Sequence, residues 1–122
     1  MTELTVETRE VDGVTLLYPT GLINAHTVRV FESEIRRAVA EGRFKLVVNC
    51  SALSYIASAG LGALMGAIEE IRENGGDLRL ANLNATVFNI VEILGFHPLY
   101  RIFASEMEAI RSFRPAGASP GQ

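Results

Sequence analysis

The sequence predicts one α/β domain, in which a mixed β-sheet of four to five strands packs with about four α-helices. The chain begins with two strand-like segments joined by the turn signal Asp12-Gly13. Helix-like and strand-like segments then alternate to the C-terminus. With 122 residues, of which 48% are hydrophobic and 20% charged, the chain is long enough to bury a single core.

The first two strands form a hairpin. In residues 4–8 apolar and polar side chains alternate, which is typical of a half-exposed strand. Residues 14–18 form the returning strand, and we expect Pro19 and Gly21 to end it. The polar residues 24–27 that follow suit the start of a helix, because side chains of this kind cap backbone N–H groups.

Apolar side chains at helical spacing predict the first two helices. The first begins near Val28, is stopped by Glu41-Gly42, and turns one face inward through Val28, Phe31, Ile35 and Val39. The second begins at Ser58 and is closed by Asn74-Gly75-Gly76, where a glycine can take a positive φ. Its apolar stripe consists of Leu61, Leu64, Met65, Ile68 and Ile71.

The remaining elements follow the same alternation. Strands are expected at residues 44–48, 77–81 and 100–103. A third helix runs from Asn84 to Gly95 with Val87, Phe88, Val91 and Leu94 inward, and a fourth runs from Ser105 to Phe113 with Met107 and Ile110 on its core side. Residues 1–113 therefore form a single domain, and residues 114–122 have the composition of a flexible tail.

Composition and charge narrow the possible partners and the compartment. The net charge is −3 and no basic cluster occurs, which argues against nucleic acid or an anionic membrane as a partner. The longest uncharged stretch, residues 46–68, is broken by polar residues and glycines, so we expect no membrane insertion. The N-terminus lacks a signal-peptide pattern, and a lone Cys50 excludes an intramolecular disulfide. A cytoplasmic protein is expected.

Motifs for catalysis are weak or incomplete. Gly60-Leu-Gly62 and Gly66 only partly match a dinucleotide fingerprint, and no phosphate-cradling Gly-Lys-Ser/Thr occurs. Ser58, Asp77 and His97 have the order of a hydrolase triad, but Ile56 stands where the nucleophile elbow needs glycine. His26 and His97 lack carboxylates at metal-binding spacing. We expect no enzyme, metal or cofactor; a small enzyme or nucleotide binder that uses the glycines is a weaker alternative.

The stretch "YIASAGLGALMGAIEEI", residues 55–71, places the hydroxyl of Ser58 where a helix begins. The first N–H groups of a helix have no partner within it, and its dipole puts partial positive charge there. Ser58 could simply cap these N–H groups. Alternatively, a phosphate on its hydroxyl would be well placed beside them.

Opposite the apolar stripe of this helix lie the small residues Ala59, Gly62, Ala63 and Gly66. A solvated face normally carries charges, as the later turns do, whereas small residues let another backbone approach closely. The approaching element could be the first or third helix of this domain, or it could belong to a partner protein.

Three blocks of sequence resemble those of the anti-sigma factor antagonists, small proteins of the STAS class. Residues 53–65, "LSYIASAGLGALM", are similar to the signature of that family, in which a serine after an Asp is phosphorylated by a kinase that is also the anti-sigma factor. Residues 21–35 and 73–96 resemble two further blocks, and order and spacing agree over residues 4–112. The resemblance implies the STAS fold and maps the phosphoacceptor onto Ser58.

Two residues depart from the pattern of the family. Asn24 and Ala57 stand where the family has acidic residues, so the neighbourhood of Ser58 carries less negative charge. Ala59 replaces the next hydroxyl, which leaves Ser58 as the acceptor within the motif. The loss of these carboxylates weakens what the resemblance implies about a particular kinase partner.

The resemblance implies a bacterial signal-transduction protein that regulates transcription by partner switching. It would bind an anti-sigma factor with serine kinase activity, would lose this partner when Ser58 is phosphorylated, and would be restored by a serine phosphatase. A monomer or weak dimer is expected. The expected partner-binding residues are Asn24, His26, Thr27, Ala57, Ser58, Ala59, Gly60, Gly62, Ala63 and Gly66. The alternative is a non-phosphorylated STAS interaction subunit of a larger signalling or membrane-transport complex.

Overall fold

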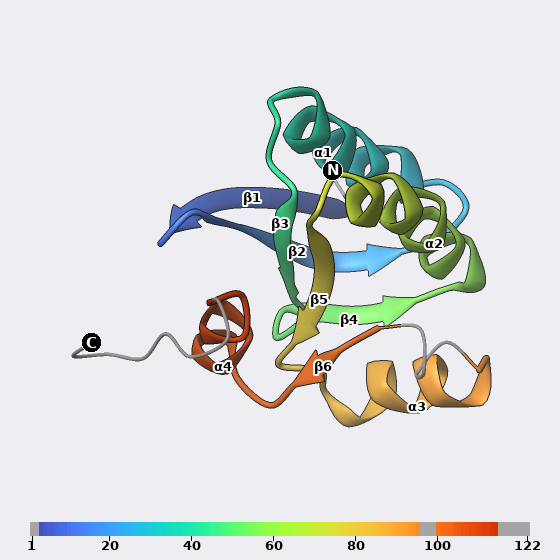
Figure 1. Ribbon diagram of the computed structural model, residues 1–122. Helices are drawn as coiled ribbons and strands as arrows, with labels where there is room; N and C mark the ends of the chain where they lie inside the picture. Colours follow the sequence, from blue (N-terminus) through green and yellow to red (C-terminus); the bar gives the residue numbers. More distant parts are fainter. Residues whose placement is uncertain (1–2, 96–99, 115–122) are drawn as a thin grey trace.

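The computed structural model describes residues 3–95 and 100–114, which form a mixed α/β domain (Figure 1). Its six strands are β1 (Leu4–Val11), β2 (Val14–Ile23), β3 (Lys45–Asn49), β4 (Leu53–Ile56), β5 (Asp77–Ala81) and β6 (Ile102–Phe103). Its four helices are α1 (Val28–Ala40), α2 (Ser58–Glu73), α3 (Ala85–Ile93) and α4 (Glu106–Arg111). The predicted α/β class and the four helices are confirmed, and the sheet has one strand more than expected.

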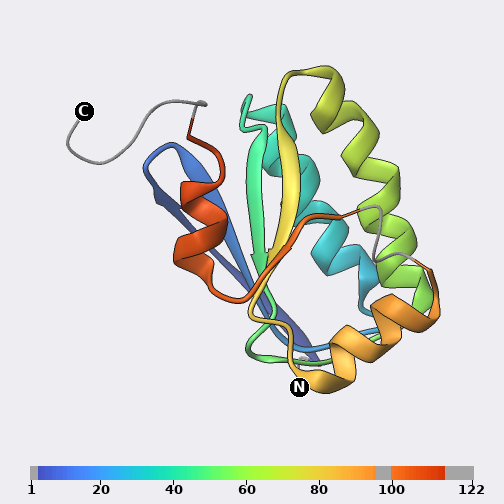
Figure 2. The same ribbon diagram turned by 60° about the horizontal axis from the view of Figure 1, so that its bottom comes forward.

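The sheet has the order β1-β2-β3-β5-β6, and β4 pairs separately with β2. Among the strand pairs formed by the described residues, only the β1–β2 hairpin is antiparallel. Its predicted turn is confirmed, since Asp12 and Gly13 have φ values of 53° and 79°. Helices α1 and α2 cover one face of the sheet and α4 lies against the other, while α3 packs beside β4 (Figure 2).

The prediction that Pro19 and Gly21 end the second strand is wrong. β2 runs on to Ile23, and it pairs with β1 from Val14 to Gly21. On its other edge it pairs with β3 through Thr15–Leu17 and then with β4 from Gly21 onward. Pro19 thus falls between the two parallel pairings, and Gly21, at φ 114°, takes up the register shift where the second one starts.

The core lies mainly between the sheet and the inner faces of α1 and α2. Phe31 and Ile35 of α1 and Leu61, Leu64 and Ile71 of α2 are buried there, as predicted. A smaller cluster on the other face packs α4 against β2, β3 and β5, and it consists of Val14, Leu16, Val47, Ala81, Ala109 and Ile110.

Three side chains predicted to point inward do not. Met107 on α4 is 52% exposed, so α4 contacts the sheet through Ala109 and Ile110 instead. Leu94 is 44% exposed just after α3, and Met65 on α2 is also exposed. All three stand at the margin of an apolar stripe, where a small rotation of the helix decides between core and surface.

Candidate functional site

Ser58 is the first residue of α2, and its side chain is exposed. Of the two alternatives for Ser58, side-chain capping of this helix is excluded. The N-cap position belongs to Ala57, which has extended backbone (φ −84°, ψ 167°) and no side chain able to bond the free N–H groups. No acidic residue occupies the first turn of α2 either. The Ser58 hydroxyl therefore stands at a helix N-terminus that has neither a side-chain cap nor a compensating charge.

The pairing of β4 with β2 brings Ser58 beside the loop at residues 24–27. Ile23 pairs with Ile56, and the N–H of Ala57 donates to the Ile23 carbonyl over 2.8 Å. Two parallel strands thus end at the same edge, and the loop that follows each one lies there. The sequence predicted that these segments belong to one surface, and the structure does bring them together.

Within that loop, Asn24 and Thr27 hold the backbone. The Asn24 Oδ1 accepts hydrogen bonds from the N–H groups of His26 at 2.8 Å and Thr27 at 3.0 Å. The Thr27 hydroxyl donates to the Leu22 carbonyl over 2.9 Å, and Thr27 is only 7% exposed. In the free protein Thr27 is therefore too buried to contact a partner, contrary to the prediction for this residue. His26 is exposed and Asn24 is half-buried, so both remain accessible.

Gly60 is buried and is likewise not available to a partner. A Cβ atom on Gly60 would lie 2.6 Å from Cγ2 of Ile23 and 2.8 Å from Cγ1 of Ile56. Glycine is needed here because the first turn of α2 lies directly on the ends of β2 and β4. The predicted role of Gly60 as a docking residue is replaced by one in packing.

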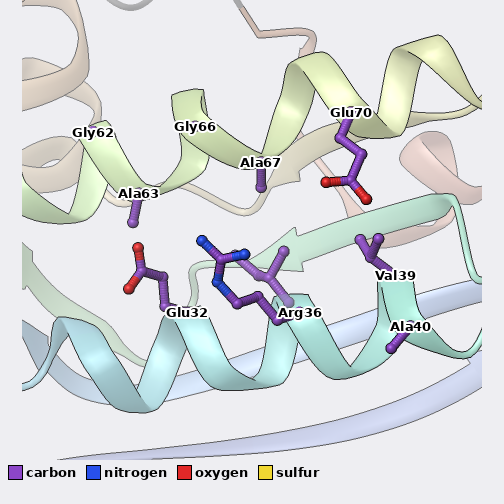
Figure 3. Close-up of a pocket in the computed structure, with 10 residues that line it drawn as sticks. Glu32, Arg36, Val39, Ala40, Gly62, Ala63, Gly66, Ala67 and Glu70 are labelled. Atoms are coloured by element: carbon purple, nitrogen blue, oxygen red, sulfur yellow. The ribbon is translucent and has the colours of Figure 1, made fainter.

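Of the other small residues of α2, Gly62, Ala63 and Gly66 border an open groove beside α1 (Figure 3). Ala59, Gly62 and Gly66 are exposed and Ala63 is half-buried. The groove has a volume of about 280 Å³, with an apolar floor that includes Val39 and Ala67 and with Glu32, Arg36 and Glu70 along its sides. A Cβ on Gly62 or Gly66 would meet nothing within 4 Å, so packing against α1 does not explain these glycines.

A second hollow next to Ser58 was not predicted. It has a volume of about 270 Å³ and is lined by Tyr55, Ile56, Ala57, Ser58, Ile90, Ile93 and Leu94. The signal in the sequence is a second apolar face on α3, since Ile90, Ile93 and Leu94 follow helical spacing apart from the buried Val87 and Val91. Of these three residues, only Leu94 was predicted to point inward.

The side chains considered for catalysis either make other contacts or lie outside the described residues. Both Asp77 carboxylate oxygens accept hydrogen bonds from arginines, and His97 lies outside the described residues. Burial raises the pKa of the Cys50 thiol to about 12, which keeps it protonated in the core. Within residues 3–95 and 100–114, no group of three or more His, Cys, Asp or Glu side chains could hold a metal ion. In the same ranges, no helix has the length and apolar character needed to cross a membrane.

The chain is similar in sequence to known regulatory proteins. Over 107 residues it is 28% identical to BtrV of Bordetella bronchiseptica, provisionally named an anti-sigma factor antagonist, with 88% of this chain and 92% of BtrV covered. Over 98 residues it is 30% identical to the anti-sigma-B factor antagonist of Listeria monocytogenes, with 80% of this chain and 84% of the relative covered.

Solved structures share the fold. The anti-sigma factor antagonist SpoIIAA in its unphosphorylated form matches with a TM-score of 0.76 at 24% identity, over 91% of this chain and 100% of SpoIIAA. The phosphorylated form of SpoIIAA, a Bacillus cell fate determinant, matches with a TM-score of 0.69 over 90% of this chain and 100% of SpoIIAA. The family model of the STAS domain matches residues 5–109. This chain therefore belongs to the STAS domain family, as its three sequence blocks predicted.

Proposed function

We propose that this protein is an anti-sigma factor antagonist that binds an anti-sigma factor with serine kinase activity and releases it when Ser58 is phosphorylated. One observation carries the proposal: the motif serine is an exposed hydroxyl on the first turn of an uncapped helix, beside an uncharged surface of small residues. The names of the relatives support the class of partner. The protein acts by binding, has no catalytic activity of its own, and works in the cytoplasm.

The docking surface is the part of the edge around Ser58 that remains accessible. Ala59, Gly62 and Gly66 continue from Ser58 along α2, and His26 lies across the edge in the loop after β2. Because a Cβ on Gly62 or Gly66 would meet nothing within 4 Å, a partner backbone has room to approach α2 there. The buried residues Gly60 and Thr27 shape this surface from beneath.

Phosphorylation would change this surface through charge. A phosphoserine carries close to two negative charges at neutral pH. The helix N-terminus stabilises that dianion in the free protein, since the first turn has no acidic residue and no side-chain cap. Docking would strip water from the dianion, and an uncharged or acidic partner surface could not replace it. Phosphorylated protein should then dissociate, and a serine phosphatase would restore binding.

The test compares Ser58 variants in binding and phosphorylation by anti-sigma factor kinases of the same organism. Ser58→Ala should keep the partner bound and incorporate no phosphate, whereas Ser58→Asp should bind at least about tenfold more weakly. Ser54→Ala is the matched control, because Ser54 is also exposed, on the adjacent strand β4. Phosphate incorporation that survives in Ser58→Ala, or equal affinities of the two Ser58 variants, would refute the switch.

A second candidate function is a STAS interaction subunit that is not phosphorylated, within a signalling or transport complex. It is favoured by Ala57 and Asn24, which stand where the resemblance places acidic residues beside the acceptor. Mass spectrometry of the protein purified from its own host discriminates the two. A phosphate on Ser58 supports the switch, and its absence under every growth condition supports the second candidate.

A further inference from the structure

The hollow between β4 and α3 adjoins Ser58 and is lined mainly by apolar side chains. Ser58 and Ala57 form one side of it, and Ile90, Ile93 and Leu94 come from α3 and its end. Within the part of the chain that the structure describes, none of the seven residues that line it is charged. Ile93 is 81% exposed and Tyr55 46%, so the largest apolar groups of this region face solvent rather than the core. Contiguous exposed apolar surface of this kind marks interaction sites.

Hydrogen bonds at the N-terminus of α3 fix the position of this helix, and with it the shape of the hollow. Asn84 caps α3 by accepting from the N–H of Val87 over 2.9 Å. Its amide also donates to the carbonyl of Leu53 in β4 over 2.7 Å. One side chain therefore fixes α3 against the strand that leads to Ser58, and the hollow exists before any partner binds.

The geometry points to this hollow as the site that receives an apolar side chain of the anti-sigma factor, with Ser58 at its rim as the gate. This inference rests on the proposed function and adds the residues that supply the binding energy. At about 270 Å³ the hollow is smaller than the usual pocket for a cofactor or drug-sized ligand and suits one or two side chains. Its lining within the described residues includes Ser58 itself and carries no charge, so the hollow is continuous with the proposed docking surface and suits an apolar group of the same partner.

Phosphorylation acts on the same hollow. An apolar side chain that enters it must displace water from its rim, and a phosphate on Ser58 holds that water strongly. The switch therefore needs no movement of the backbone. A charge at one residue makes burial of its uncharged neighbours unfavourable.

The experiment measures affinity for the anti-sigma factor kinase of the same organism that phosphorylates the wild-type chain in vitro. Ile93→Ser should weaken binding by at least about tenfold and raise the KM for phosphorylation of Ser58, with the thermal midpoint unchanged because Ile93 is exposed. Met107→Ser is the matched control, since Met107 is 52% exposed on α4, at the opposite face of the sheet, and should bind normally.

The outcomes separate the two proposals. If no anti-sigma factor kinase binds or phosphorylates the wild-type chain, the proposed function has failed, and the inference fails with it. If the wild-type chain binds and Ser58→Asp does not, but Ile93→Ser binds like wild type, only the inference is overturned. It is also overturned if Ile93→Ser abolishes a homodimer seen by analytical ultracentrifugation while affinity for the kinase stays unchanged, because the occupant is then a second copy of this chain.

Discussion

Gly60 and Ile23 are in such close contact that a Cβ atom on Gly60 would lie 2.6 Å from Cγ2 of Ile23. Gly60→Ala should therefore push the first turn of α2 away from the ends of β2 and β4. We expect a loss of about 1–3 kcal/mol in the free energy of unfolding, as overpacking of a core contact produces. Urea denaturation measures it. An unchanged unfolding midpoint would show that Ile23 and Ile56 can rotate away, and that Gly60 is not required for packing.

The glycine two residues further on should respond in the opposite direction. Because a Cβ on Gly62 meets nothing within 4 Å, Gly62→Ala should raise the free energy of unfolding by about 0.5–1 kcal/mol through better helix propensity. If a partner backbone docks here, the same variant should bind the anti-sigma factor more weakly. A variant that is more stable and binds normally would remove Gly62 from the docking surface.

Ala57 holds an N-cap conformation without a capping side chain, so Ala57→Asp should stabilise α2 by about 0.5–2 kcal/mol. Thermal denaturation at neutral pH measures the gain. Ala52→Asp introduces the same charge at an exposed position before β4, outside any helix, and should give almost no gain. If both variants are equally stable, the cap is not the cause. The change also restores the carboxylate that the resemblance to the family places before the acceptor.

Because of Asp77, the free energy of unfolding should depend on pH in the acidic range. Burial raises the pKa of this carboxyl, but hydrogen bonds from Arg79 and Arg72 outweigh burial, so its pKa lies below its usual value. A pKa that is lower in the folded state gives stability that is present above the unfolded pKa of about 4 and is lost as pH falls through the folded pKa.

Asp77→Asn should therefore cost about 1–3 kcal/mol at pH 7 and flatten the loss of stability in acid. Urea denaturation at pH 7 and pH 3 gives both values. Glu10→Gln serves as the control, because Glu10 pairs with Arg43 at an exposed site and should contribute almost nothing. A parallel pH profile for wild type and Asp77→Asn would contradict the assignment.

Elements with a local signal were predicted correctly. Asp12-Gly13 specifies its turn by itself, and Asn84 and Ser105 cap α3 and α4 through side chains that accept from the N–H three residues on. The buried apolar stripe of α1 was also predicted correctly, because Phe31 and Ile35 lie one helical turn apart. In each case the physical cause lies within a few residues of the feature.

Features that depend on distant partners were missed. β4 has four residues and no clear alternation, and it is a strand because β2 pairs with it. Pro19 was predicted to end the second strand. The sequence does not show that β2 changes its parallel partner from β3 to β4 around this residue, where proline is tolerated. The start of α2 at Ser58 was predicted correctly, but Ala57 rather than Ser58 holds the N-cap position, which only the backbone angles decide. The hollow beside Ser58 needs α3 to lie against β4, which no local pattern encodes.

The C-terminal end of β2 is hydrogen-bonded to a neighbouring segment on each of its two edges. The N–H of Gly21 donates to the Ala52 carbonyl, and the N–H of Leu22 donates to the Glu3 carbonyl. The stretch that leads into Ile23, and through it positions Ala57 and Ser58, is thus anchored by the third residue of the chain. A truncation that removed Glu3, or a bulky affinity tag fused before it, should weaken the pairing at this end of β2 and so loosen the backbone that positions Ser58. Assays of Ser58 should accordingly use protein tagged at the C-terminus.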